Sequence, residues 1–252
     1  MSSRKKVLIT GATSGVGFET AKRLVTEGHA VQATGRNPAR LAELEQYGAV
    51  VYREDLSLEG AADRLMKLID MPDTVIFSAG VAKFALAADT SDEDIDRMFT
   101  VNVQSVIQLT QRILPAWVAR QSGHFLFIGS QAGKVATPKA AVYAATKHAL
   151  IGYTDALRME AAQSGIDVTV VNPGPIDTAF LDTADDTGNY RTSVGRHLLT
   201  ADGVAAAVVA AVKQPVREIS LPRIMGVTSR LHALAPALTE RIGKKYFMKK
   251  LE

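Results

Sequence analysis

The feature that most constrains the fold is the alternation of short apolar runs with longer amphipathic stretches along the whole chain. Apolar runs that predict strands end near residues 9, 34, 52, 77, 128, 171 and 221, and helical patterns lie between them. Strands that alternate with helices form parallel sheets with right-handed crossovers and helices on both faces. The 252 residues contain no proline- or glycine-rich linker and no internal repeat. The sequence therefore predicts a single doubly wound α/β domain with about seven parallel strands.

Composition fits a globular protein and excludes several classes of function. Hydrophobic residues make up 47% of the chain and charged residues 22%, both close to the globular average. The absence of cysteine excludes disulfides, iron–sulfur clusters and thiol nucleophiles. A net charge of +3 is too small to indicate nucleic-acid binding. The first apolar run is too short for a signal peptide, and no run reaches the length of about 18 residues that predicts a membrane helix, so we expect a cytoplasmic protein.

A glycine-rich turn joins the first predicted strand to the first predicted helix and reads Thr10-Gly11-Ala12-Thr13-Ser14-Gly15-Val16-Gly17. Glycines at such a turn permit the tight bend, the approach of a pyrophosphate to the backbone, and close packing of helix on strand. The N-terminus of the helix adds free N–H groups and a partial positive charge. We therefore expect a Rossmann fold that binds a dinucleotide through Gly11, Thr13, Ser14, Gly15, Val16 and Gly17.

The residues after the second predicted strand indicate which dinucleotide binds. NAD-binding proteins place a carboxylate there to bond the ribose 2′-hydroxyl. This chain reads Thr34-Gly35-Arg36-Asn37 and has no carboxylate at that point. The planar guanidinium of Arg36 can pair with a 2′-phosphate. The sequence therefore favours NADP(H). The alternative is that Arg36 is a surface arginine on a loop with no role in cofactor binding.

Three further residues suggest acid–base chemistry. Tyr143 and Lys147 are four residues apart in a helix predicted over 140–163, and so lie on one helix face. A nearby ammonium is expected to lower the tyrosine pKa from its ordinary value of about 10 and so to suit the phenol to proton transfer. Ser130 ends the fifth predicted strand, at the edge of the sheet where ligands bind, and its hydroxyl can bond a substrate carbonyl. The Tyr–Lys spacing often arises by chance, so it gains weight only beside Ser130 and the dinucleotide turn.

Together these motifs resemble the short-chain dehydrogenase/reductase family over about residues 5–222. The family's glycine motif matches Thr10, Gly11, Gly15 and Gly17, and its catalytic residues match Asn102, Ser130, Tyr143 and Lys147. Further cofactor contacts implied by the resemblance are Asp55 and Leu56 at the adenine, Ala79 and Gly80 beside the cofactor, and Pro173, Ile176 and Thr178 in the segment that holds the nicotinamide amide. The chain departs from the family at Phe77-Ser78-Ala79-Gly80, where two asparagines usually precede Ala-Gly.

The resemblance implies an NADP(H)-dependent oxidoreductase that acts on a small-molecule carbonyl or alcohol and assembles as a homodimer or homotetramer. Tyr143 would donate the proton during reduction, and Lys147 would also bond the nicotinamide ribose. Ser130 would orient the carbonyl, and Asn102 would hold a water in a proton relay. The alternative is a catalytically silent protein of the same fold that senses NADP(H), although a sensor does not need all four residues.

The pattern of apolar and polar residues is least regular in the C-terminal third of the chain. Residues 178–200 are polar and irregular, which predicts a long loop that closes over the substrate. We divide the chain into a Rossmann domain over 1–222 and a helical extension over 223–252, with Leu231, Leu234 and Leu238 at helical spacing. The extension is expected to pack on the domain or on a partner subunit, a lid or a membrane contact being the alternatives. Its basic end, residues 243–250, is expected to be solvated, and none of the five histidines has metal-ligand spacing.

Overall fold

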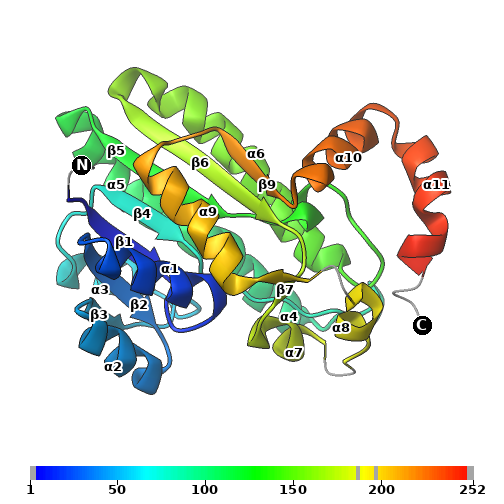
Figure 1. The fold of residues 1–252 in the computed structure, drawn as a ribbon, viewed down its shortest axis with the longest axis horizontal. Coiled ribbons are helices and arrows are strands. Elements are labelled where there is room, and N and C mark those ends of the chain that lie inside the picture. The colour runs from blue at the N-terminus through cyan, green and yellow to red at the C-terminus, as the bar shows by residue number, and fades with distance from the viewer. Residues whose placement is uncertain (1–3, 186–187, 196–197, 249–252) are drawn as a thin grey trace.

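A seven-stranded parallel sheet forms the centre of the molecule (Figure 1). The computed structural model describes residues 4–185, 188–195 and 198–248. The strand order is β3-β2-β1-β4-β5-β6-β9, and every neighbouring pair is parallel. The strands are β1 (Lys6–Thr10), β2 (Ala30–Gly35), β3 (Val50–Arg53), β4 (Thr74–Phe77), β5 (Gly123–Ile128), β6 (Ile166–Pro173) and β9 (Glu218–Leu221). Since the order reverses between β1 and β4, ligands are expected outside the carboxyl ends of these strands.

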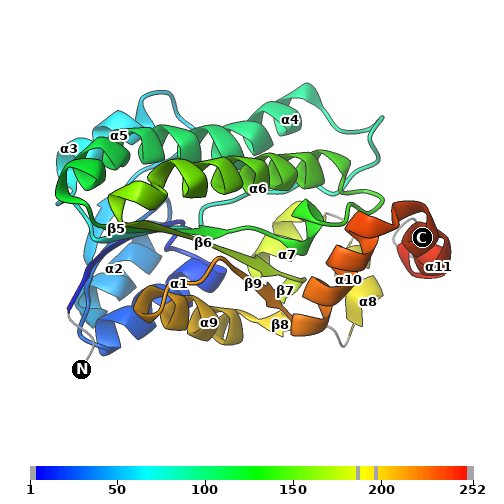
Figure 2. The same ribbon diagram turned by 90° about the horizontal axis from the view of Figure 1, so that it is seen from above.

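Helices cover both faces of the sheet, as the alternating pattern predicted. One face carries α1 (Gly15–Thr26), α2 (Pro38–Tyr47) and α9 (Ala201–Lys213). The other carries α3 (Ala61–Leu68), α5 (Ser105–Arg120) and α6 (Ala141–Ala161). Figure 2 shows α5 and α6 on one side of the sheet and α1 and α9 on the other. The predicted doubly wound Rossmann fold is confirmed.

Alternation of side chains along each strand divides the interior into two cores. In β1, Val7 and Ile9 pack against the α1 and α9 side, whereas Leu8 packs against the α5 and α6 side. All three side chains are completely buried. Because successive side chains of a strand point to opposite faces, a strand buried on both faces must be continuously apolar. That requirement explains why the predicted strands appear in the sequence as short apolar runs.

The chain between residues 92 and 120 forms two helices joined by a π-helical turn. Helix α4 (Asp92–Phe99) is followed by a π-helical turn at Thr100–Gln104, and α5 follows directly. A π-turn inserts one residue into a helix and locally changes the direction in which side chains point. It places Asn102 inside the protein.

The prediction of a long irregular loop over 178–200 was wrong. The segment contains α7 (Ala179–Ala184), α8 (Asn189–Val194) and β8 (Leu199–Thr200), which pairs in parallel with β7 (Ile176–Asp177). Although the segment is mostly polar, a few of its apolar residues pack against the domain. Leu181 and Ala184 are buried, and the Ala184 carbonyl accepts a hydrogen bond from the Phe84 N–H at 2.7 Å. Asp186 and Arg196, which belong to the predicted loop, lie outside the described residues.

The C-terminal extension is helical, as predicted, and consists of two helices. Helix α10 (Arg223–Leu234) ends before Pro236, which begins α11 (Pro236–Met248). Proline removes a backbone donor and clashes with the preceding turn, so the helix cannot continue through this point. Leu238 therefore does not share a helix face with Leu231 and Leu234. Of the side chains that the structure places in these two helices, Ser229 alone is buried.

Figures 1 and 2 show α10 and α11 projecting at the end of the molecule opposite α2. The division of the chain at residue 222 stays a prediction, and so does a partner subunit on the extension. Lys249 and Lys250 of the basic end lie outside the described residues. Within the described part of the chain, no helix combines the length and the apolar character that crossing a membrane requires.

Candidate active site

The glycine-rich turn forms one wall of a cavity at the carboxyl edge of the sheet. Gly11 has a φ of 65°, and a Cβ built on it would lie 2.6 Å from the Ala79 backbone, so no larger residue fits. Ser14 precedes α1 but makes no side-chain capping bond, and no acidic residue stands in the first turn. The first N–H groups of α1 and its partial positive charge are therefore available to an anion. This arrangement fits the diphosphate of a dinucleotide.

Most of the predicted cofactor residues line the same cavity, whose volume is about 720 Å³. The predicted residues that line it are Gly11, Thr13, Ser14, Gly15, Val16, Arg36, Asp55, Leu56, Ala79, Gly80, Tyr143, Lys147, Pro173, Ile176 and Thr178. Gly17 and Asn102 do not line it. A Cβ on Gly17 would lie 2.5 Å from the Gly11 carbonyl oxygen, so Gly17 permits close packing of α1 on the turn rather than contact with a ligand.

The end of the cavity beside β3, where the adenosine is predicted to lie, contains a second carboxylate, Glu54, that the sequence analysis did not single out. Glu54 and Asp55, at the end of β3, line the cavity together with Arg36. Arg64 pairs with Glu54 through two bonds of 2.8 and 3.1 Å, which neutralises that carboxylate. Asp55 accepts hydrogen bonds from the Ser57 N–H and hydroxyl, and the Arg36 guanidinium lies 3.8 Å from Asp55. The Arg36 side chain is 55% exposed, so it can turn toward a phosphate.

Ser130, Tyr143 and Lys147 meet at the centre of the cavity wall. Ser130 follows β5, while Tyr143 and Lys147 lie on one face of α6, as their spacing predicted. The Ser130 hydroxyl is hydrogen-bonded to the Tyr143 hydroxyl. The Lys147 ammonium donates to the Ile128 carbonyl at 2.9 Å and lies 5.8 Å from the centre of the Tyr143 ring. The structure thus brings together the three side chains for which the sequence predicted proton transfer.

The predicted lowering of the tyrosine pKa does not occur in this structure. Burial raises the pKa of Tyr143 to about 12, and the hydrogen bond with Ser130 opposes that rise. Burial also lowers the pKa of Lys147 to about 8. Loss of hydration disfavours both phenolate and ammonium, and here it outweighs their mutual attraction. The prediction failed because spacing along a helix says nothing about how deeply the two groups are buried.

Asn102 holds two segments of the chain together beside these three side chains. Its Oδ1 accepts from the Val81 N–H at 2.8 Å, and its Nδ2 donates to the Val81 carbonyl at 2.8 Å and to the Thr146 hydroxyl at 3.1 Å. The amide thus connects the segment after β4 to α6. Its described contacts are positional, and its role in a water relay stays a prediction.

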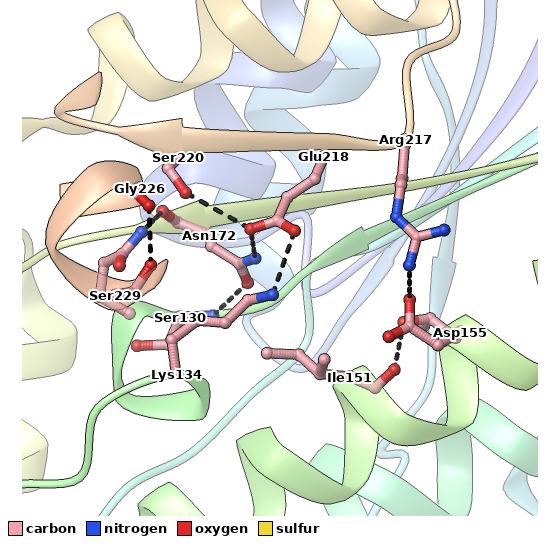
Figure 3. A network of polar contacts seen from close by, with 12 residues as sticks. Ser130, Lys134, Ile151, Asp155, Asn172, Arg217, Glu218, Ser220, Gly226 and Ser229 are labelled. Atoms are coloured by element: carbon pink, nitrogen blue, oxygen red, sulfur yellow. Dashed lines mark hydrogen bonds and ion pairs between the residues drawn. The ribbon is translucent and has the colours of Figure 1, made fainter. Parts of the chain in front are cut away.

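A polar network holds the turn that carries Ser130 (Figure 3). The Ser130 N–H donates to Asn172 Oδ1 at 3.2 Å, and Asn172 Nδ2 donates to Glu218 Oε1 at 3.1 Å. Lys134, on the same turn as Ser130, pairs with Glu218 at 3.0 Å. Asn172 is completely buried, and a Cβ on Gly129 would overlap its Oδ1. Glu218, at the start of the last strand, therefore supports the Ser130 turn through two paths.

Sequence reasoning missed the residues that form the rest of the cavity. Two aromatic rings lie beside Tyr143: Phe84 lies 6.1 Å from its ring, edge-on, and Phe180 lies 6.0 Å from it. A third ring, Tyr190, lies 4.4 Å from Phe84. Residues of α10 and α11 complete the lining, namely Met225, Thr228, Leu231, His232, Thr239, Ile242 and Gly243. These side chains come from distant segments that only the fold brings together, and no spacing in the sequence could have indicated them.

The histidines lie in different environments. His148 is exposed on α6, whereas His232 lines the cavity and bonds the Thr239 hydroxyl at 2.8 Å. Among the residues whose placement is described, no group of three His, Cys, Asp or Glu side chains is arranged to hold a metal ion. His197 lies outside the described residues.

Comparisons with known proteins agree with this geometry. The profile of the short chain dehydrogenase family matches residues 5–188. The uncharacterized oxidoreductase YbbO of Escherichia coli is 36% identical over 189 residues, which cover 73% of this chain and 70% of the relative. The dehydrogenase/reductase SDR family member 7B of Bos taurus is 32% identical, covering 94% of this chain and 79% of the relative.

Solved structures with the same architecture include two NADP(H) complexes. Serine dehydrogenase with NADP+ is 29% identical with a TM-score of 0.80, covering 86% of this chain and 94% of that one. A short-chain dehydrogenase from Sphingobium yanoikuyae with NADPH is 25% identical with a TM-score of 0.79, covering 94% and 95%. With its family profile, its relatives and its seven-stranded fold in agreement, the chain belongs to the short-chain dehydrogenase/reductase family of oxidoreductases.

Proposed function

We propose that this protein is an NADP(H)-dependent oxidoreductase that interconverts a carbonyl and an alcohol, with Tyr143 as the general acid and base. The observation that best supports the proposal is the meeting of Ser130, Tyr143 and Lys147 on one cavity. The other end of that cavity offers the uncapped N-terminus of α1 and the guanidinium of Arg36. Dinucleotide binding and proton transfer are thus joined in one site.

The three central residues divide the work of carbonyl reduction. NADPH, when bound, supplies the hydride to the carbonyl carbon. The Tyr143 phenol gives its proton to the carbonyl oxygen. The Ser130 oxygen accepts the Ala132 N–H at 3.0 Å, which leaves the hydroxyl proton free to bond the substrate oxygen or Tyr143. The Lys147 ammonium stabilises the phenolate that remains, until a proton from solvent restores the phenol.

The protonation states favour reduction near neutral pH. A Tyr143 pKa of about 12 and a Lys147 pKa of about 8 leave both groups protonated there. A protonated phenol can act as an acid but not as a base. Oxidation of an alcohol requires the phenolate, so bound cationic cofactor would have to lower the tyrosine pKa first.

Arg36 supports the choice of NADP(H). It lies at the adenosine end of the cavity, and its ion pair with Asp55 is long and partly exposed. Such a pair is worth little, so a doubly charged phosphate can replace the carboxylate as partner. The two NADP(H)-bound relatives support the same choice by analogy. A small-molecule substrate, assembly as a homodimer or homotetramer, and a cytoplasmic location stay predictions of the same proposal.

A screen of NADPH oxidation over aldehydes, ketones, quinones and oxoacyl thioesters tests the proposal. Tyr143→Phe should lower kcat by about a hundred- to ten-thousandfold, because the acid is lost. Binding of NADPH, followed by its fluorescence, should change less than about threefold. Tyr153→Phe is the matched control, since Tyr153 lies on the same helix but packs in the core away from the cavity.

Two outcomes would contradict the proposal in different ways. Undiminished turnover in Tyr143→Phe would remove Tyr143 from the mechanism. NADPH binding without turnover of any carbonyl class would instead identify a protein that binds the cofactor without catalysis.

A further inference from the structure

Charged and uncharged side chains line different parts of the cavity. Its charged lining residues at the cofactor end are Arg36, Glu54 and Asp55, and Lys147 stands at the reaction centre. Beyond Tyr143, the described lining has no lysine, arginine, aspartate or glutamate. It consists of Val81, Phe84, Gln131, Ala132, Val135, Thr137, Ala140, Phe180, Leu181, Tyr190 and the α10–α11 residues named above. A carboxylate or phosphate placed there would lose its hydration without meeting a lysine or arginine, and His232, whose ring bonds the Thr239 hydroxyl, is the one imidazole in this described lining.

The uncharged part begins at the catalytic hydroxyl. The Phe84 ring lies edge-on to Tyr143 and close to Tyr190, and Phe180 stands on another side of Tyr143. Each ring comes from a different segment, so their meeting is a product of the fold. An aromatic wall of this kind favours an apolar group beside the reacting carbonyl and keeps water away from it.

The apolar lining continues outward along the C-terminal helices. Leu231 of α10 and Ile242 of α11 both line the cavity, yet they are 54% and 76% exposed. Side chains that line a cavity and also face solvent mark its mouth. An apolar ligand too long for the interior would extend over these two residues and shield them from water.

We infer that the substrate is an uncharged aldehyde or ketone with an extended apolar body, whose tail leaves the cavity between Leu231 and Ile242. The inference rests on the proposed function and adds the substrate class. The carbonyl lies at Ser130 and Tyr143, the adjoining carbons lie against Phe84, Phe180 and Tyr190, and the tail contacts α10 and α11.

A chain-length series tests the inference with the complete protein. Unbranched methyl ketones from propanone to undecanone are compared as substrates with NADPH. The value of kcat/KM should rise with each methylene, by at most about fourfold, the limit set by complete burial of a methylene. Keto acids of matched length that end in a carboxylate should react at least about tenfold more slowly than the corresponding ketones.

A binding measurement separates the substrate class from the catalytic proposal. Unreactive primary amides of increasing chain length are titrated into the NADPH-bound protein, and cofactor fluorescence reports their dissociation constants. Binding that tightens with length in the absence of turnover would support the apolar site while overturning the proposed reaction. Turnover that does not depend on chain length, or that prefers the carboxylates, would overturn the substrate class and leave the proposed reaction standing. Amide binding that does not tighten with length would also overturn the substrate class.

Two exposed leucines on one helix provide a matched pair of variants. Leu231→Ser should reduce the ratio of kcat/KM for undecanone over propanone by at least about threefold. Leu234→Ser should leave that ratio unchanged, because Leu234 is 84% exposed and does not line the cavity. Equal effects of the two substitutions would overturn the placement of the tail.

Discussion

At the scale of single residues, burial decides the chemistry of the tyrosine–lysine pair. Tyr143 is 9% exposed and Lys147 is 5% exposed. Without a bound cofactor, loss of hydration raises one pKa and lowers the other, so the pair is held in its proton-donating form. The buried ammonium is a cost to folding, of the kind that proteins accept at functional sites.

The free-energy cost of burying the Lys147 ammonium can be measured by replacing Lys147 with an uncharged residue. The pKa of Lys147 falls from 10.5 to about 8 on folding, so between these values the unfolded chain binds more protons and stability rises with pH. Lys147→Met should raise the free energy of unfolding by roughly 1–3 kcal/mol near neutral pH and abolish turnover. At about pH 9.5 the gain should fall to less than half. Urea unfolding of the cofactor-free protein at both pH values is the measurement, and a gain that does not depend on pH would contradict the assignment.

Arg36 decides the cofactor if its guanidinium meets a 2′-phosphate. Arg36→Ala should weaken NADPH binding by about ten- to a hundredfold, the value of one charge-assisted interaction, and change NADH binding less than about threefold. Arg53→Ala is the matched control, since Arg53 is exposed near the same strand ends but does not line the cavity. Dissociation constants from cofactor fluorescence provide the comparison. Equal losses for NADPH and NADH would remove the NADP(H) assignment.

At the scale of elements, the last strand supports the turn that carries Ser130. Strand β9 pairs with β6 at the edge of the sheet, and its register places Glu218 near Asn172 and the Ser130 turn (Figure 3). The carboxylate holds both the buried Asn172 amide and the Lys134 ammonium. A residue 88 positions after Ser130 in the sequence therefore helps to fix the Ser130 backbone.

Removing the Glu218 carboxylate should affect both stability and catalysis. Glu218→Ala leaves the Asn172 amide without its protein acceptor and should lower the free energy of unfolding by roughly 1–2 kcal/mol. It should also lower kcat more than it raises KM, because the Ser130 turn loosens. Glu218→Gln keeps an acceptor for Asn172 and should recover most of the loss. Urea unfolding and steady-state kinetics of both variants test this, and identical behaviour of the two would exclude the hydrogen bond as the cause.

At the scale of the whole molecule, the C-terminal helices belong to the site more than to the core. Both helices follow β9. Among their described side chains, Met225, Leu231 and Ile242 line the cavity. Apart from Ser229, their described side chains are not buried, so they add little apolar burial to the fold. The apolar core and this part of the cavity lining therefore lie in different parts of the chain.

A truncation tests that separation. Removal of residues 236–252 should change the melting temperature by less than about 2 °C, because the described side chains of α11 bury little surface. Activity on the shortest reactive ketones should be reduced less than activity on the longest. Thermal unfolding followed by circular dichroism and the chain-length series are the measurements. A fall of more than about 5 °C would show that α11 is part of the folded core.

The fold and the meeting of the central residues in one cavity could be predicted because local patterns encode them. Buried parallel strands must be continuously apolar, a dinucleotide turn needs its glycines, and Tyr143 and Lys147 share a helix face by spacing alone. The same local reasoning failed over residues 178–200, where a few anchors such as Leu181 outweigh a polar sequence. It also failed at Pro236, a helix breaker that the apolar spacing on either side obscured.

By itself, the sequence determined the doubly wound sheet, the dinucleotide turn and the identities of Ser130, Tyr143 and Lys147. Only the tertiary structure decided how those groups are buried, and hence the direction in which their pKa values move. It also decided that Glu218 supports Ser130, and that rings and helices from distant segments enclose the reaction centre. The physical reason is that hydration and contact depend on neighbours in space, whereas periodicity and turn chemistry depend on neighbours along the chain.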